Sequence, residues 1–155
     1  MILLVDNHDS FTFNLAHLLA EVSGIEPVVV RTEEVEREGI LRRLADGEFD
    51  HVVIGPGPGT PHNDKDFKIA GQVIDASNKL PLLGVCLGHQ GLGLRHGAQL
   101  QTIRPHHGIV SRIHHSRRGI FAGLPQDFEA TRYHSLCLTT LGDQIVEHAR
   151  AEDGA

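Results

Sequence analysis

The chain has 155 residues, a length typical of one domain that can bury a hydrophobic core without disulfides or metals. Its 14 Lys and Arg residues against 20 Asp and Glu residues give a formal net charge of −6, which argues against a nucleic-acid or anionic-membrane partner. Its apolar runs of four or five residues are too short to form a membrane span. Two cysteines cannot make a disulfide framework and indicate a reducing, cytoplasmic environment.

Strand-like and helix-like segments alternate through the first 85 residues. Short apolar runs predict strands at residues 1–5, 27–31, 51–55 and 80–85. Apolar residues at helical spacing predict helices at residues 10–22, 35–45 and 66–77. In the first helix we expect Ser10 to be the N-cap and Gly24 to end the helix. Its expected inward face consists of Phe11, Leu15, Leu18, Leu19 and Val22.

This alternation predicts an α/β fold with βαβ units and a parallel sheet. Ligands of such sheets bind beyond the carboxyl ends of the strands, where Asp6, Asn7, the loop 56–61 and Cys86 should gather. From residue 98 onward the pattern changes to short β-like runs at 98–103, 108–113, 137–140 and 144–148. They predict an antiparallel extension.

The sharpest local feature is Gly84-Val-Cys86-Leu-Gly88, the cysteine form of a nucleophile elbow between a strand and a helix. Small flanking residues are needed because the backbone of such a turn is crowded. We expect the helix N-terminus to lower the pKa of the Cys86 thiol, and the Leu87 amide to donate to an oxyanion. The alternative is an inert cysteine buried at a strand end. Cys137, between two leucines, is expected to be a core residue.

A second feature is the loop Gly55-Pro-Gly-Pro-Gly-Thr-Pro61, in which glycine allows close approach of the backbone to a ligand. It follows a strand, so it can present an N–H group beside Cys86. The alternative is a stiff surface turn. The loop lacks the Lys-Ser/Thr pair of a phosphate-binding loop.

Four motifs carry a resemblance to a known family. They are Asp6-Asn-His-Asp-Ser10-Phe, Gly55-Pro-Gly-Pro-Gly-Thr-Pro61, Gly84-Val-Cys-Leu-Gly-His-Gln90 and Arg132-Tyr-His-Ser-Leu136. In order and spacing they resemble the class I (triad) glutamine amidotransferases, specifically the glutaminase components of anthranilate synthase and aminodeoxychorismate synthase. The resemblance implies one amidotransferase domain over residues 1–155, with a flavodoxin-like, mostly parallel sheet, helices on both faces and an antiparallel extension in the C-terminal third.

The resemblance also implies a chemistry. Cys86 would attack the side-chain amide of glutamine, giving a γ-glutamyl thioester and ammonia. The backbone of Gly57 and Leu87 would form the oxyanion hole. The substrate would be held by Gly57, Pro58, Gly59, Gln90, Ser135 and Leu136. The ammonia would pass to a chorismate-utilising synthase subunit or fused domain, and no cofactor or metal is implied in this chain.

The family's histidine base lies on a C-terminal His-Pro-Glu-Ser segment, and no His-x-Glu occurs in this sequence. We therefore expect the domain to be incomplete at its C-terminus; His89 and His134 are not expected to replace the base. The first alternative is a degenerate module that binds glutamine or a partner without hydrolysing it. The second is an unrelated cysteine hydrolase on a similar sheet. The family's His-Gly-Lys is replaced here by His107-Gly-Ile109, which puts partner contacts there in doubt.

The 12 histidines are unusual for this length. The pairs His106-His107 and His114-His115 are expected to be exposed polar positions, not a metal site, because adjacent residues on a strand point to opposite faces. Arg112, Arg117 and Arg118 predict a local basic patch at a solvated or partner-facing edge.

Overall fold

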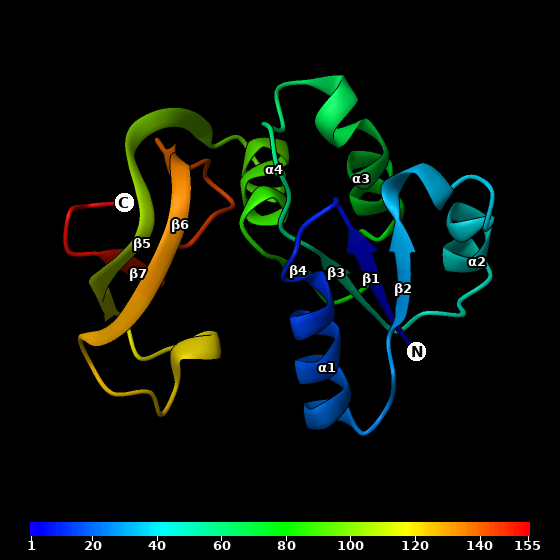
Figure 1. The fold of residues 1–155 in the computed structure, drawn as a ribbon, viewed down its shortest axis with the longest axis horizontal. Helices are drawn as coiled ribbons and strands as arrows, with labels where there is room; N and C mark the ends of the chain where they lie inside the picture. The colour runs from blue at the N-terminus through cyan, green and yellow to red at the C-terminus, as the bar shows by residue number, and fades with distance from the viewer. The chain divides into compact units, whose positions relative to one another are not determined.

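The computed structural model describes residues 1–155, and the chain folds as two units, Met1–Leu92 and Gly93–Ala155 (Figure 1). The first unit contains strands β1 (Ile2–Asp6), β2 (Val28–Arg31), β3 (His51–Ile54) and β4 (Leu82–Gly84). Its helices are α1 (Thr12–Ser23), the 3-10 turn η1 (Thr32–Glu34), α2 (Ile40–Ala45), α3 (Asp64–Ala76) and the start of α4 (Leu87–Arg95). None of the helices is long and apolar enough to cross a membrane.

The four strands of the first unit form one parallel sheet in the order β2-β1-β3-β4. Parallel pairing brings the carboxyl ends of β1, β3 and β4 to the same edge, so the segments that follow them share that edge. The predicted α/β fold with a parallel sheet is confirmed.

Helices cover both faces of this sheet. Leu3, Val5, Val52 and Ile54 belong to a cluster that also contains buried residues of α2 and α3. The alternate residues Leu4 and Val53 pack on the other face, where Ala16 of α1 is buried with them. This alternation follows from the two-residue period of a strand, and it confirms the prediction of helices on both faces.

The start of α1 differs from the prediction. The N-cap is Phe11, and Ser10 does not cap the helix. The turn is instead held by the carboxylate of Asp6, which is 5% exposed and accepts bonds from the His8 and Asp9 amides and from the Thr12 hydroxyl. An ionised carboxylate has about four acceptor sites, whereas a serine hydroxyl has two and could not satisfy all three of these donors.

The inward face of α1 was only half predicted. Thr12 and Ala16 are buried, and Leu15 and Leu19 pack partly against the sheet. Phe11, Leu18 and Val22 are exposed. Small residues at positions 12 and 16 let the helix approach the sheet closely, so they face it in place of the larger apolar residues. Gly24 ends the helix in a left-handed conformation, as predicted (φ 71°).

The segment 35–45 is helical only in its second half, from Ile40 to Ala45. Gly39 adopts φ 59°, a left-handed conformation that interrupts a right-handed helix. The chain before Gly39 forms η1 and turns. The apolar positions were nevertheless correct, because Val35, Ile40 and Leu44 are all buried.

The second unit is an antiparallel sheet in the order β6-β5-β7, with β5 at Gln99–His115, β6 at Phe128–Thr139 and β7 at Ala149–Ala151. The 3-10 turn η2 (Gly119–Phe121) lies between β5 and β6. The predicted runs 98–103 and 108–113 fall on one strand, β5, whose pairing with β6 shifts register between Thr102 and His106 and again between His107 and Ile109. The predicted strand at 144–148 is wrong, since β7 begins only at Ala149.

The histidine pairs of the second unit are not uniformly exposed. His107 and His114 are exposed, as predicted. His115 is buried and stacks on Phe121, with ring centroids 5.4 Å apart. His106 is half-buried and lies 3.2 Å from a carboxylate oxygen of Asp153. A strand sends adjacent side chains to opposite faces, so one member of each pair is drawn inward.

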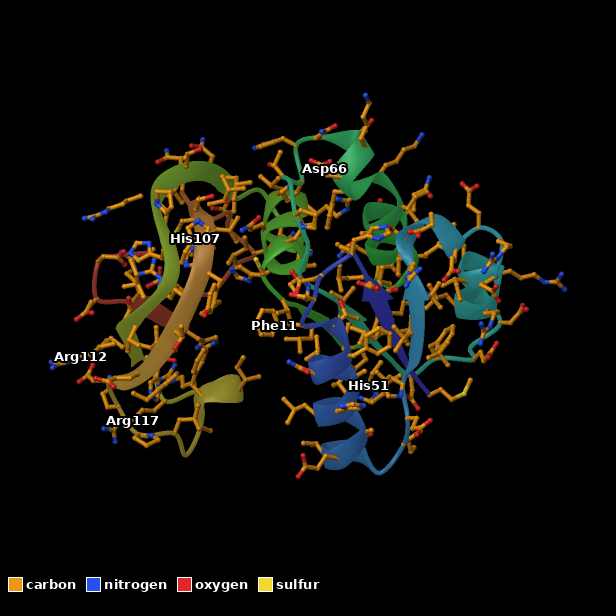
Figure 2. The ribbon with its side chains drawn as sticks, in the orientation of Figure 1. Phe11, His51, Asp66, His107, Arg112 and Arg117 are labelled. Atoms are coloured by element: carbon orange, nitrogen blue, oxygen red, sulfur yellow. The ribbon has the colours of Figure 1, made fainter.

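The predicted basic residues of the second unit are at its surface. Arg112, Arg117 and Arg118 are exposed, and Figure 2 shows Arg112 and Arg117 at the periphery of this unit. No group of three or more His, Cys, Asp or Glu side chains is arranged to hold a metal ion.

Candidate active site

Cys86 lies between the last residue of β4, Gly84, and the first residue of α4, Leu87. Its φ of 51° is in the left-handed region, which costs a non-glycine residue about 1–3 kcal/mol and persists only where the surroundings enforce it. A Cβ on Gly84 would lie 2.6 Å from the carbonyl carbon of Gly88. The predicted strand-to-helix elbow is therefore confirmed, with its flanking glycines in mutual contact.

Hydrogen bonds fix this elbow to the end of β3. The Val85 amide donates to the Ile54 carbonyl (2.9 Å), continuing the parallel ladder past the last residue of β4. On the other side of Cys86, the Gln90 amide donates to the Cys86 carbonyl (2.9 Å) and closes the first turn of α4. The strained residue is thus held by regular structure on both sides.

The environment of the Cys86 thiol shifts its pKa in the direction opposite to the predicted one. Burial raises the pKa of Cys86 above the ordinary value of a thiol; a bond with the Leu87 amide lowers it, and the Asp9 carboxylate raises it further. The predicted lowering of the thiol pKa by the helix N-terminus is wrong in this structure, because desolvation is the larger effect. A nucleophile in this state needs a base to remove its proton.

The raised pKa predicts slow alkylation of Cys86 at neutral pH. Only the thiolate reacts, so the rate with iodoacetamide should rise through a midpoint above that of a free cysteine. In Asp9→Asn the midpoint should move down, because a negative charge that opposes ionisation is removed. The measurement is peptide-resolved mass spectrometry across pH, which separates Cys86 from the free Cys137. A midpoint below that of free cysteine would contradict the assignment.

The two residues expected to form the oxyanion hole lie together. Gly57, in the loop after β3, packs so closely on α4 that a Cβ on it would lie 3.0 Å from Cδ2 of Leu87. Leu87 itself is 1% exposed and belongs to the core. The side chain of Leu87 thus packs against the backbone of Gly57.

The remaining predicted substrate residues fall into two groups. Pro58 and Gly59 are exposed in the loop that carries Gly57, and Gln90 is buried one helical turn after Cys86. Ser135 and Leu136 are half-buried on β6 of the second unit. Their part in holding glutamine stays a prediction.

His134 and Cys137 flank this segment of β6. His134 accepts a bond from Arg132 Nε (2.9 Å) at Nε2 and donates from Nδ1 to the Leu136 carbonyl (2.8 Å), so both ring nitrogens are engaged. This agrees with the expectation that His134 is not a catalytic base. Cys137 is only half-buried, so the expectation of a core cysteine is not confirmed.

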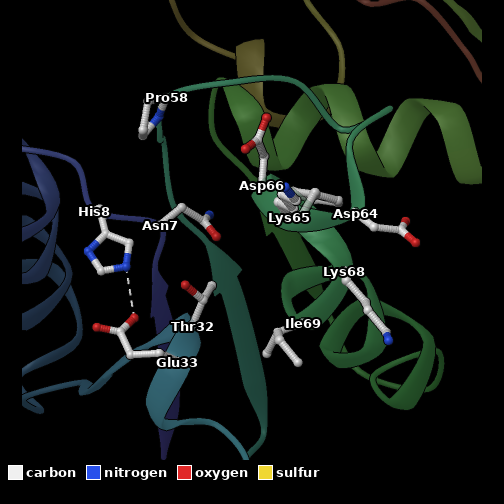
Figure 3. Close-up of a pocket in the computed structure, with 11 residues that line it drawn as sticks. Asn7, His8, Thr32, Glu33, Pro58, Asp64, Lys65, Asp66, Lys68 and Ile69 are labelled. Atoms are coloured by element: carbon white, nitrogen blue, oxygen red, sulfur yellow. Dashed lines mark ion pairs between the residues drawn. The ribbon is translucent and has the colours of Figure 1, made fainter.

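Sequence reasoning missed Asn7, the residue after β1, and Asp66 of α3, both of which contact the loop 55–60. Both line a cavity of about 340 Å³ beside that loop, in which His8 forms a 2.8 Å ion pair with Glu33 (Figure 3). The position of Asp6 and Asn7 at a strand end was the available signal. It placed Asn7 at the correct edge but gave it no role.

Comparisons with known proteins agree with the elbow and the sheet. Residues 3–155 match the family model described as Glutamine amidotransferase class-I. The chain is 47% identical over 154 residues to an aminodeoxychorismate synthase of Streptomyces griseus, covering 98% of this chain and 20% of that protein. It is 39% identical over 160 residues to the anthranilate synthase component 2 of Methanothermobacter marburgensis, covering 99% of this chain and 80% of that protein.

A solved structure shares the fold. A putative GMP synthase protein of Thermoplasma acidophilum superposes with a TM-score of 0.79 at 24% identity, over 97% of this chain and 72% of that one. The chain spans about a fifth of the length of the Streptomyces relative. It covers four fifths of the Methanothermobacter relative, and the family model spans nearly all of its residues. The chain belongs to the class-I glutamine amidotransferase family.

Proposed function

We propose that this chain is the glutaminase part of an enzyme that aminates chorismate, and that Cys86 is its nucleophile. The observation that carries the proposal is the left-handed backbone of Cys86 on a strand-to-helix turn. An L-residue is held in this conformation only at a cost, and such strain is concentrated at functional sites. The family assignment supplies glutamine as the substrate class.

The proposed reaction has two steps. The Cys86 thiolate forms a C–S bond to the side-chain carbonyl carbon of glutamine; the C–N bond breaks, and the nitrogen takes up a proton and leaves as ammonia. Water then attacks the thioester, the C–S bond breaks, glutamate leaves and the thiol regains its proton. In both steps the carbonyl oxygen becomes negative, and the Gly57 and Leu87 amides would stabilise it.

The remaining roles follow from likeness to the family. Pro58, Gly59, Gln90, Ser135 and Leu136 would help Gly57 to hold glutamine, and a histidine oriented by a carboxylate would accept the thiol proton. Such a base is needed because the pKa of Cys86 is raised: proton transfer from the thiol to the histidine makes the thiolate available at neutral pH. Cys86 and Cys137 are both free, which suits a reducing cytoplasm.

The acceptor of the ammonia is inferred from the relatives. One is an aminodeoxychorismate synthase and another an anthranilate synthase component 2, so a chorismate-utilising synthase, as a subunit or a fused domain, is the proposed partner. Ammonia released at Cys86 would be consumed in the active site of that synthase. The partner therefore determines which amino product is formed.

The test uses the protein as its gene encodes it, with the synthase, chorismate and glutamine. Glutamate should be released together with an equal amount of an amino product, and chromatography of that product separates anthranilate from aminodeoxychorismate. As a control, the synthase with an ammonium salt should form the product without this protein. Product from ammonium but no glutamate from glutamine would contradict the proposal.

A further inference from the structure

The loop 55–60 is held from outside, not by bonds within it. It contains Pro56 and Pro58, which have no N–H group, and three glycines. Backbone bonds enter it only at its ends, where the Gly55 amide donates to Val5 (2.9 Å) and the Thr60 carbonyl accepts from Asn63 (3.1 Å). The prolines restrict the backbone locally, but no hydrogen bond within the loop ties the Gly57 amide to the rest of the fold.

Asn7 holds the first half of the loop. The residue is 3% exposed, and its side-chain Nδ2 donates to the Gly55 carbonyl (2.9 Å). Gly57 packs directly on the same residue, because a Cβ there would lie 2.5 Å from Cβ of Asn7 and 2.6 Å from its carbonyl oxygen. Gly57 is therefore confined between Asn7 of β1's carboxyl end and Leu87 of α4.

Asp66 holds the second half. It lies in the first turn of α3, and its Oδ2 accepts the Thr60 amide (3.1 Å). Gly59, with φ 83°, is pressed against the same carboxylate: a Cβ there would lie 2.5 Å from Cγ of Asp66. Figure 3 shows Asn7, Pro58 and Asp66 around the course of this loop.

We propose that Asn7 and Asp66 are positioning residues that anchor the two halves of the loop 55–60, and so keep the Gly57 amide where it stabilises the oxyanion. The inference rests on the proposed glutaminase function. Neither residue needs to touch the substrate. Each acts through the backbone it holds.

A cost to the fold supports this role for Asn7. Its Oδ1 is buried and has no hydrogen-bond partner. Such an orphan acceptor costs about 1–3 kcal/mol, so an asparagine here is not the residue that stability alone would favour. What asparagine provides is the Nδ2 group that donates to the Gly55 carbonyl, and this hydrogen bond holds the first half of the loop 55–60.

The test compares four variants of the protein as its gene encodes it, assayed with synthase, chorismate and glutamine. Asn7→Ala and Asp66→Ala should each lower kcat about 10- to 100-fold, because the loop moves without losing its amide; outright removal of an oxyanion donor costs about 10²–10³-fold. KM should rise by a smaller factor than kcat falls, since the same loop carries Gly57, Pro58 and Gly59, which are proposed to hold glutamine. Asp66→Asn keeps an oxygen that can accept the Thr60 amide, so its kcat should stay within about threefold of wild type. Asn7→Asp loses the donor and should behave like Asn7→Ala.

Rates are counted per reactive site, titrated by an electrophilic glutamine analogue that alkylates Cys86. A merely structural role would lower the number of sites and leave kcat per site unchanged, which would overturn the inference. A rise in KM alone, or equal losses in Asp66→Ala and Asp66→Asn, would overturn it as well. If Asn7→Ala does not fold, the comparison of Asp66→Ala with Asp66→Asn still tests the inference. Asp66 is only half-buried, so we expect both of these variants to fold.

Failure of the inference is distinct from failure of the proposed function. Inactive Cys86→Ala together with full kcat per site in Asn7→Ala and Asp66→Ala would overturn only the positioning role. Activity of Cys86→Ala equal to wild type would remove the nucleophile itself, and the loop would no longer serve an oxyanion.

Discussion

Replacement of Cys86 by alanine is expected to lower glutamine-dependent amination by about 10⁴-fold or more, because removing the nucleophile of a hydrolase leaves only the small rate enhancement of the rest of the site. Glutamate release and product formation should fall together. Product formation from an ammonium salt should be unchanged, since that reaction bypasses the thiol. The measurement is the paired rate of glutamate and product formation with each nitrogen source.

Two comparisons make this expectation specific. Alanine keeps the Cβ that Cys86 holds at φ 51°, so the melting temperature of Cys86→Ala should lie close to that of wild type, and loss of activity will not reflect unfolding. Cys137→Ala removes the second free, half-buried thiol, whose pKa is also raised by burial, and should keep full activity. Equal loss in both cysteine variants, or none in Cys86→Ala, would refute the assignment of the nucleophile.

The parts of the fold that the sequence predicted are those specified by neighbouring residues. The strand starting at His51 is an uninterrupted apolar run after its first residue, and the elbow is marked by Gly84 and Gly88. In both, the local pattern and the tertiary structure agree, so sequence reasoning placed them within a residue or two. The same edge of the sheet then collects Asn7, the loop 55–60 and Cys86.

The predictions that were wrong concern segments whose structure depends on contacts with residues far away in the sequence. The run 144–148 has a β-like pattern, yet β7 forms at Ala149–Ala151 because pairing with Ile113 to His115 of β5 fixes it. The predicted inward face of α1 differs from the observed one, because the close approach of the helix to the sheet favours Thr12 and Ala16 over larger residues. Neither partner is visible in the local sequence.

The site shows the same division. The position of Cys86 was predictable, but the direction of its pKa shift was not, because burial and the Asp9 carboxylate depend on the folded surroundings. The anchors Asn7 and Asp66 were missed for a related reason. The Asn7 bond to Gly55 spans 48 residues, and although the Asp66 bond to Thr60 spans only six, it requires α3 to turn back on the loop.

Gly88→Ala is expected to cause the largest loss of stability among substitutions at the elbow. A Cβ on Gly88 would lie 2.8 Å from the carbonyl carbon of Ile54 and closer still to its oxygen. Ile54 belongs to β3, between β1 and β4 in the sheet, and its carbonyl accepts the Val85 amide. Neither backbone can move without breaking this bond, so we expect a loss of about 3 kcal/mol in the free energy of unfolding, at the upper end of the usual cost of overpacking.

Gly47→Ala is the matched control, because it adds the same methyl group where nothing lies within 4 Å. Its φ of 76° leaves only the left-handed strain of an L-residue, about 1 kcal/mol. Urea unfolding of both variants separates the two costs: steric overlap with Ile54 should make Gly88→Ala about 2 kcal/mol less stable than Gly47→Ala. Equal losses in the two variants would mean that α4 can shift away from β3. In that case the left-handed conformation of Cys86 would not be enforced by this packing, and the strain would need another source.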